Sequence, residues 1–194
     1  MSVSGGQFPI EIEKGSLKKC AQSLLDLVLE RDGHPLIYSE FCEREPRLNK
    51  IPAEVFLREY VPAKLALGCV FWTGCCASHQ IADKESKNLF FKQVMSLFES
   101  PKSLEDATRF SESLYASNAE TEQSPVLGVL VHLFHKLGFE AVLKKGEDDE
   151  GRLSPAFVFM MEVCDALKNS IEGKFDDSID AHEAIQTKKK EGAG

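Results

Sequence analysis

The chain has 194 residues, of which 43% are hydrophobic and 28% are charged, and its formal net charge is -8 at pH 7. This length and composition fit one globular domain that needs no disulfide or structural metal, and they exclude a wholly disordered chain. The acidic balance argues against nucleic acid and anionic membranes as partners, because both attract clustered lysine and arginine. Six cysteines without an N-terminal secretory signal favour a reducing, cytoplasmic location.

The N-terminal part of the chain predicts an arm followed by a helix. Residues 1–15 are aperiodic and contain glycine and serine, so we expect a loose arm. Ser16 is a candidate N-cap, and Gly33 is a candidate stop. Between them the apolar residues fall on one helical face, namely Leu17, Cys20, Leu24, Leu27 and Val28. Residues 36–49 are ambiguous and form either a short helix or a connection.

An uncharged segment, residues 65–82, marks the centre of the predicted core. Small and bulky residues are mixed along it, so neighbouring elements can approach a helix here on several sides. Pro52 opens a helical stretch, and Pro62 predicts the start of a separate central helix from Ala63 to about Ile81. The segment barely reaches the length of a membrane span and contains several polar residues, which argues against that interpretation.

Further helices are expected after the central one. One covers about residues 84–99, and three serine–proline pairs then predict helix starts, because serine caps a helix and proline is tolerated in its first turn. The pairs are Ser100–Pro101, Ser124–Pro125 and Ser154–Pro155. The helices that they open are expected over about residues 104–119, 126–137 and 156–171, with Gly138 and Gly173 as the stops of the last two.

The sequence therefore predicts an all-α fold, with residues 16–173 forming one domain of about six to eight helices around the helix from Ala63 to Ile81. Residues 139–153 include the acidic run 146–151, and we favour a loop there over a small hairpin. Residues 174–194 are expected to form a weakly structured tail. The paired aromatics Phe90–Phe91 and Phe157–Phe159 are interpreted as core residues rather than as an interface.

The clearest pattern of potential metal ligands is a cysteine–histidine pair and a histidine–histidine pair. Cys76 and His79 lie three residues apart, as do His132 and His135, so each pair can present two ligands from one helical face. If the pairs faced each other, they would form a tetrahedral metal site. We favour a packed Cys76 and histidines at helix edges, because structural zinc sites usually have tighter ligand spacing.

Evidence for catalysis is weak. A thiol nucleophile at Cys75 or Cys76 with His79 as its base is one alternative, and an inert buried thiol is favoured. The chain has no nucleophile elbow, phosphate-binding loop or dinucleotide-binding motif, and its acidic runs do not fit a calcium loop. The sequence thus predicts no catalytic residue and no cofactor.

The stretch from about Phe56 to Gly138 resembles an uncharacterised bacterial all-helical family of unknown function. The resemblance is carried by CVFWTGCCA at residues 69–77, ESPKSLEDA at residues 99–107 and SPVLGVLVHLFHKLG at residues 124–138. It implies a helical fold with proline-opened helices and an association with secretion, since members of the family occur near secretion genes. It implies no catalytic residue.

Three functions are compatible with these observations. The first is a non-enzymatic cytoplasmic adaptor that binds another protein, which predicts a contiguous apolar patch and no convergent polar pocket. The second is a metal-binding protein that uses Cys76, His79, His132 and His135. The third is a small-molecule sensor with a pocket beside Trp72. The sequence favours the adaptor and does not fix an oligomeric state.

Overall fold

The computed structural model describes residues 14–30, 33–46, 51–100, 103–118, 124–139, 142–143 and 152–191. Within these ranges the chain forms eight helices and one pair of two-residue strands, which confirms the all-α fold class. Residues 1–13 of the expected N-terminal arm lie outside the described ranges. Lys14 and Gly15, which were assigned to that arm, already belong to the first helix, so Ser16 is not its N-cap.

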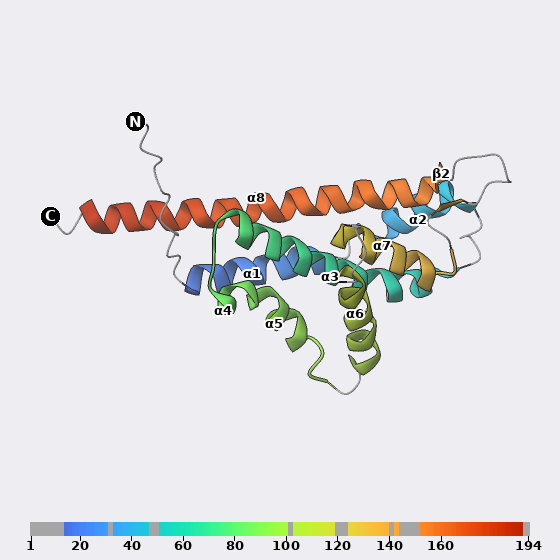
Figure 1. Cartoon of the computed structure of the whole chain (residues 1–194), viewed down its shortest axis with the longest axis horizontal. Coiled ribbons are helices and arrows are strands. Elements are labelled where there is room, and N and C mark those ends of the chain that lie inside the picture. Colours follow the sequence, from blue (N-terminus) through green and yellow to red (C-terminus); the bar gives the residue numbers. More distant parts are fainter. Residues whose placement is uncertain are drawn as a thin grey trace.

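The elements are, in chain order, α1 (Lys14–Leu29), α2 (His34–Arg44), α3 (Ala53–Ser78), α4 (Lys84–Lys87), α5 (Leu89–Ser96), α6 (Leu104–Ser117), α7 (Pro125–Lys136), β1 (Val142–Leu143), β2 (Arg152–Leu153) and α8 (Pro155–Glu191). Figure 1 shows α8 running the length of the molecule along one edge, with α1 and α3 beneath it and α6 crossing near the middle.

Helix α3 is the centre of the fold, as the sequence predicted. It contacts every other helix in the described part of the chain. By length and composition it is also apolar enough to cross a membrane, and 67% of its apolar window is buried inside the protein. Packing against the surrounding helices therefore accounts for the uncharged segment that stands out in the sequence.

The predicted helix start at Pro62 is wrong. Helix α3 is continuous from Ala53 to Ser78, with Pro62 inside it. A proline within a helix lacks one backbone donor and usually costs about 3 kcal/mol. Here Phe56 and Tyr60 before the proline are as deeply buried as Leu65 after it, with exposed fractions of 1%, 2% and 2%. Burial on both sides outweighs the lost hydrogen bond.

Two helices end in the same hydrogen-bonded turn. Helix α3 stops at Ser78 rather than near Ile81, because Gln80 adopts a φ of 55° and the Ile81 N–H donates to the Cys76 carbonyl over 2.8 Å. Helix α7 ends in the same way, with Gly138 at a φ of 79°. Glycine adopts this left-handed conformation at little cost, which confirms Gly138 as a stop.

The helices expected after the three serine–proline pairs are present. Helices α7 and α8 begin at Pro125 and Pro155, as expected. Helix α6 begins at Leu104, as expected, while Pro101 lies outside the described ranges. The hydroxyl of Ser103 donates to the Ser100 carbonyl over 2.6 Å.

The expected helix end at Gly173 is also wrong. Helix α8 continues to Glu191, so residues 174–191 are helical and residues 192–194 lie outside the described ranges. The continuation has an apolar stripe, since Ile171, Phe175 and Ile179 are buried at helical spacing where α8 meets α1 and α3. Gly173 is on the exposed side, where a helical glycine costs only about 1 kcal/mol relative to alanine.

The segment between α7 and α8 contains the two strands. Val142 pairs with Leu153, and Leu143 pairs with Arg152, in antiparallel register. The flanks of the acidic run thus form the hairpin-like pairing that was the less favoured alternative. The acidic residues 146–151 themselves lie outside the described ranges.

Aromatic side chains fill the core. Trp72 packs against Phe175 of α8 at a centroid distance of 5.1 Å and against Phe90 of α5 at 6.2 Å. Phe90, Phe157 and Phe159 are buried, which agrees with their interpretation as core residues, whereas Phe91 is 37% exposed. The aromatic side chains thus join α3, α5 and α8 around the tryptophan.

Close helix crossings explain two glycines. A Cβ atom at Gly68 would lie 2.8 Å from the ring of Phe90, and one at Gly128 would collide with the carbonyl oxygen of Ala116. The first position sets the approach of α5 to α3, and the second sets the approach of α7 to α6.

We therefore expect Gly128→Ala to lower the free energy of unfolding by about 2–3 kcal/mol, because a backbone carbonyl has no room to move away from the new methyl group. Urea denaturation measures this change. Gly74→Ala is the matched control, since a Cβ there meets no atom within 4 Å and alanine favours the helix. Equal stability of the two variants would contradict the proposed close crossing.

Candidate functional site

The four predicted metal ligands do not form a site. Cys76 is completely buried in α3, and His79 follows the end of that helix, where its Nε2 lies 2.8 Å from Oδ1 of Asp176. His132 and His135 both lie on α7. Among the described residues, which include all four, no three histidine, cysteine, aspartate or glutamate side chains are placed to hold a metal ion.

His79 instead connects two helices. Besides its contact with Asp176, its ring lies 5.3 Å from the ring of Phe175, so it joins the end of α3 to the middle of α8. Asp176 is 59% exposed, and such a pair contributes little to stability. The geometry gives His79 a structural role.

The thiols beside His79 are poorly suited to nucleophilic chemistry. Burial raises the pKa of Cys75 to about 12, helped by the nearby carboxylate of Glu172. Burial also raises the pKa of Cys76 to about 11, although the ammonium of Lys87 acts in the opposite direction. A thiol attacks as its thiolate, which is scarce at neutral pH at such pKa values. The structure therefore favours inert core thiols.

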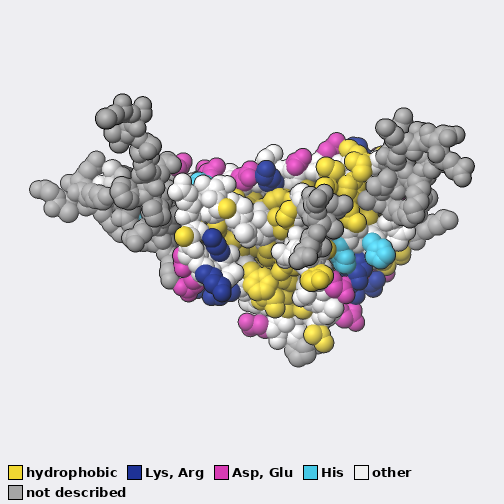
Figure 2. Space-filling view, in the orientation of Figure 1, with side chains coloured by type: hydrophobic (Ala, Val, Ile, Leu, Met, Phe, Trp, Pro, Cys, Tyr) yellow, Lys and Arg dark blue, Asp and Glu magenta, His cyan; other side chains and the backbone are white. Residues whose placement is uncertain are grey.

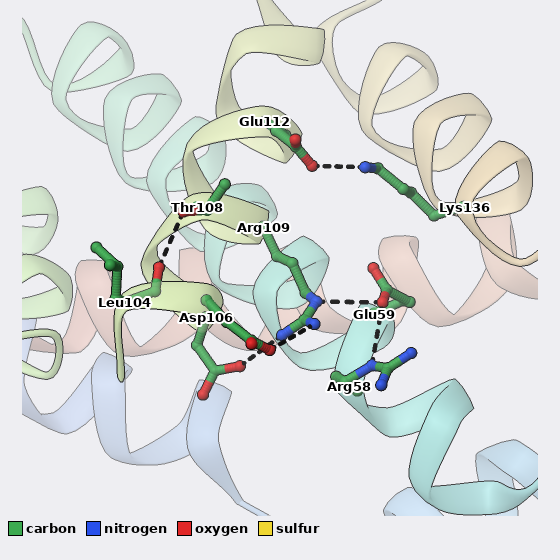
Figure 3. A network of polar contacts seen from close by, with 9 residues as sticks. Arg58, Glu59, Leu104, Asp106, Thr108, Arg109, Glu112 and Lys136 are labelled. Carbon is green, nitrogen blue, oxygen red and sulfur yellow. Dashed lines mark hydrogen bonds and ion pairs between the residues drawn. The ribbon is translucent and has the colours of Figure 1, made fainter. Parts of the chain in front are cut away.

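An ion-pair network joins α3, α6 and α7 (Figure 3). The guanidinium of Arg109 contacts Glu59 of α3 at 3.2 Å, and Glu105 and Asp106 of its own helix at 3.1 Å each. Nearby, Lys136 of α7 lies 2.7 Å from Glu112 of α6. Each basic group of this network contacts at least one carboxylate of the protein, so the network positions helices.

His132 lies beside this network. Desolvation lowers its pKa, and the positive charge of Lys136 lowers it further, while the carboxylate of Glu112 acts in the opposite direction. The neutral imidazole is therefore favoured in the folded protein. The sequence grouped His132 with metal ligands, whereas its neighbours are the charges that hold α6 against α7.

A pocket of about 320 Å³ lies beside Trp72, where α3 meets the starts of α5 and α7 and the end of α6. We call it the Trp72 pocket. Its walls are mainly apolar, and its polar side chains come from α3, the junction of α4 with α5, and α6. The lining residues are Cys69, Val70, Trp72, Thr73, Lys87, Asn88, Phe91, Leu114, Ser117, Asn118 and Pro125.

A second hollow of about 480 Å³ runs between α3, α7 and α8, and we call it the α3–α7–α8 groove. Gly74 forms part of its floor, and Val126 and Leu127 of α7 face Met161 of α8 across it. Hydrophobic side chains gather in the middle of the face shown in Figure 2 and toward the side where α7 and α8 meet.

A third hollow, of about 570 Å³, lies beside Pro62 between α1, α3 and the start of α6. Its charged side chains include Arg58 and Asp106, which already contact Glu59 and Arg109. Because these charges are engaged within the ion-pair network, this hollow offers fewer available polar groups than the Trp72 pocket.

Comparisons with protein-family models, with curated proteins and with solved structures found no match. The resemblance to a bacterial helical family therefore stays an expectation. The candidate sites depend on this chain's own geometry.

Sequence reasoning pointed to a pocket beside Trp72 but missed most of the residues around it. Lys87 and Asn88 lie in a short polar stretch that resembles an ordinary exposed turn. At the α3–α7–α8 groove, Gly74 looks in the sequence like any small core residue. The composition of α3 was the available signal for these hollows. Thr73 and Gly74 in the second half of this core helix indicate a face that other helices leave uncovered.

We expect the free energy of unfolding to fall as the pH is lowered from 7.5 to 5.5, and His132→Gln to reduce this fall. The folded-state pKa of His132 is below its ordinary value of 6.5, so the unfolded chain binds the proton first and becomes favoured as the pH falls through that value. Urea denaturation at both pH values measures the change.

His135→Gln is the matched control, because His135 is exposed on the same helix and its environment changes less on unfolding. The same loss of stability on acidification in wild type and His132→Gln would contradict a contribution from His132.

The buried thiols are expected to resist a soluble aromatic disulfide reagent in the native protein and to react when the protein is denatured. All six cysteines are free and buried, and burial raises the pKa of Cys69 and Cys164 to about 12. Absorbance of the released thiolate counts the reacted groups. Rapid reaction of Cys75 in the native protein, identified with Cys75→Ser, would restore the nucleophile hypothesis.

Proposed function

We propose that this protein is a non-enzymatic adaptor that binds an amphipathic helix of a partner protein in the α3–α7–α8 groove. The observation that carries the proposal is the uncovered face of α3. The central helix of a fold is normally covered on all sides, yet Gly74 is exposed here and a Cβ at that position meets no atom within 4 Å.

The exposed side of α3 supports close docking of a helix. Thr73, Gly74 and Ala77 are exposed and Val70 is half-buried, and these positions share one helical face. Their side chains are small, so the backbone of a second helix can approach within the 8–10 Å typical of packed helices. A partner helix seated here would cover the remaining face of α3.

The walls of the groove supply the apolar contacts. Val126 and Leu127 of α7 and Met161 of α8 are half-buried. The apolar surface extends to Val131 of α7 and Val158 of α8, which are 42% and 39% exposed. An apolar stripe between two helices matches the way amphipathic helices are held by grooves in other proteins.

The charges at the groove favour a basic partner. Asp165 and Glu172 line its α8 side, with Lys168 between them at 3.7 Å from Glu172. The whole chain has a net charge of -8. Complementary charge speeds association and selects orientation, so the fitting helix carries lysine or arginine beside its apolar stripe.

The proposal includes a cytoplasmic location and a role without catalysis or cofactor. Six free, buried cysteines support a reducing compartment. An association with bacterial secretion is implied by the family resemblance alone. The metal-binding alternative through Cys76 and His132 has no supporting geometry.

A panel of synthetic helices tests the proposal. We expect a labelled 18-residue peptide with a leucine stripe flanked by lysine to bind, as measured by fluorescence anisotropy. The same stripe flanked by glutamate should bind at least about tenfold more weakly, and a peptide of scrambled order should not bind. Gly74→Trp should abolish binding, because the indole fills the floor of the groove.

Gly173→Trp is the matched control, since Gly173 is an equally open helical glycine that does not line the groove. Circular dichroism and thermal melts verify that both variants fold. Unchanged binding by Gly74→Trp, or tighter binding of the glutamate-flanked peptide, would overturn the proposal.

A further inference from the structure

We propose that the Trp72 pocket binds a small apolar carboxylic acid, with the carboxylate on Lys87 and the apolar body between Phe91 and Leu114. This inference goes beyond the adaptor function, since it assigns a small-molecule ligand to a neighbouring hollow, which shares Val70 and Pro125 with the α3–α7–α8 groove. The argument depends on which polar groups of the pocket are still available, and on the shape and size of its walls.

Lys87 provides a cation without a counterion. It is half-buried at the end of α4 and lines the pocket. In the described part of the chain no carboxylate forms an ion pair with it, in contrast to Arg109 and Lys136, which are both paired. Its charge is felt in the interior, because it lowers the pKa of the buried Cys76. An anion in the pocket would supply the missing partner.

Asn88 provides a second polar group. It occupies the N-cap position of α5, yet its side chain makes no capping hydrogen bond. Other polar groups of the pocket are engaged in their own helices. The Thr73 hydroxyl donates to the Cys69 carbonyl over 2.9 Å, and the Ser117 hydroxyl and Asn118 amide donate to the Leu114 carbonyl over 2.6 Å and 3.0 Å. Lys87 and Asn88 both line the pocket, so both can bind one carboxylate.

The remaining walls fit an apolar body. Val70 and Leu114 are half-buried, and Phe91 is 37% exposed at the opening. The volume of about 320 Å³ is at the lower end of the range for ligand pockets. A ligand of about ten to fourteen non-hydrogen atoms suits this size. A long lipid chain or a nucleotide would be too large to be enclosed.

The position of Trp72 makes the pocket directly observable. Trp72 lines the pocket and is the single tryptophan of the chain. Its fluorescence therefore reports from the site without a label. The probe is 2-aminobenzoate, a small aromatic carboxylate whose absorption overlaps the emission of tryptophan.

The experiment is a displacement titration with the full chain. We expect the probe to quench Trp72 emission, decanoate to displace the probe, and decanol to displace it at least about tenfold more weakly, because decanol lacks the charge. Lys87→Gln should weaken decanoate binding about tenfold. Lys84→Gln is the matched control, since Lys84 is exposed on the same helix and does not line the pocket.

Equal displacement by decanoate and decanol, or unchanged decanoate binding in Lys87→Gln, would overturn the proposal. The two proposals fail separately. Lys87→Gln should bind the lysine-flanked peptide like wild type, and Gly74→Trp should bind decanoate like wild type, as read from the emission of the probe. Loss of both activities in either variant would show that the Trp72 pocket is not an independent site.

Discussion

Burial of helix α3 is the constraint on which the other features of this structure depend. The second half of the helix has no charged side chain and most of its apolar side chains are buried, so the other helices gain most by packing around it. Trp72 shows how complete this packing is. Its ring is 1% exposed, and its indole N–H donates to the Ser86 carbonyl over 3.1 Å, so even the one polar atom of the side chain has a partner.

Charged residues orient the helices, whereas burial of apolar side chains in the core stabilises the fold. Arg109 and Glu59 are 19% and 12% exposed, and their contact fixes α6 against α3 near the surface. Ion pairs of this kind add little stability but favour one arrangement of the helices over others. Among the described residues no carboxylate forms an ion pair with Lys87, which lines the Trp72 pocket. A group that contributes nothing to the alignment of helices is available for binding.

The sequence predicted the parts of the fold that depend on local pattern. The uncharged segment identified the central helix, and proline at residues 125 and 155 identified two helix starts, because these signals act over a few residues. Pro62 and Gly173 misled the prediction for the opposite reason. Each is unfavourable in a helix by a few kcal/mol at most, and burial of neighbours such as Tyr60 and Phe175 outweighs that cost.

The candidate site was less predictable than the fold. The pattern of Cys76 with His79, and of His132 with His135, places each pair on one helical face but says nothing of where the two faces point. In the folded chain His79 turns to α8, and His132 lies beside Lys136. The α3–α7–α8 groove depends on which face of α3 is left uncovered, and that depends on residues far apart along the chain.

The long final helix has a consequence for synthesis of the protein. Helix α8 packs against α1 together with α5 and α3, and the Cys20 thiol donates to the Lys174 carbonyl across 154 positions of sequence. Contacts between such distant segments form late, since the intervening chain must first be made. Until the ribosome has translated α8, the apolar residues of α1 that pack against α8 stay exposed to water. We therefore expect the nascent chain to be a client of ribosome-associated chaperones until residues 171–179 of α8 have emerged.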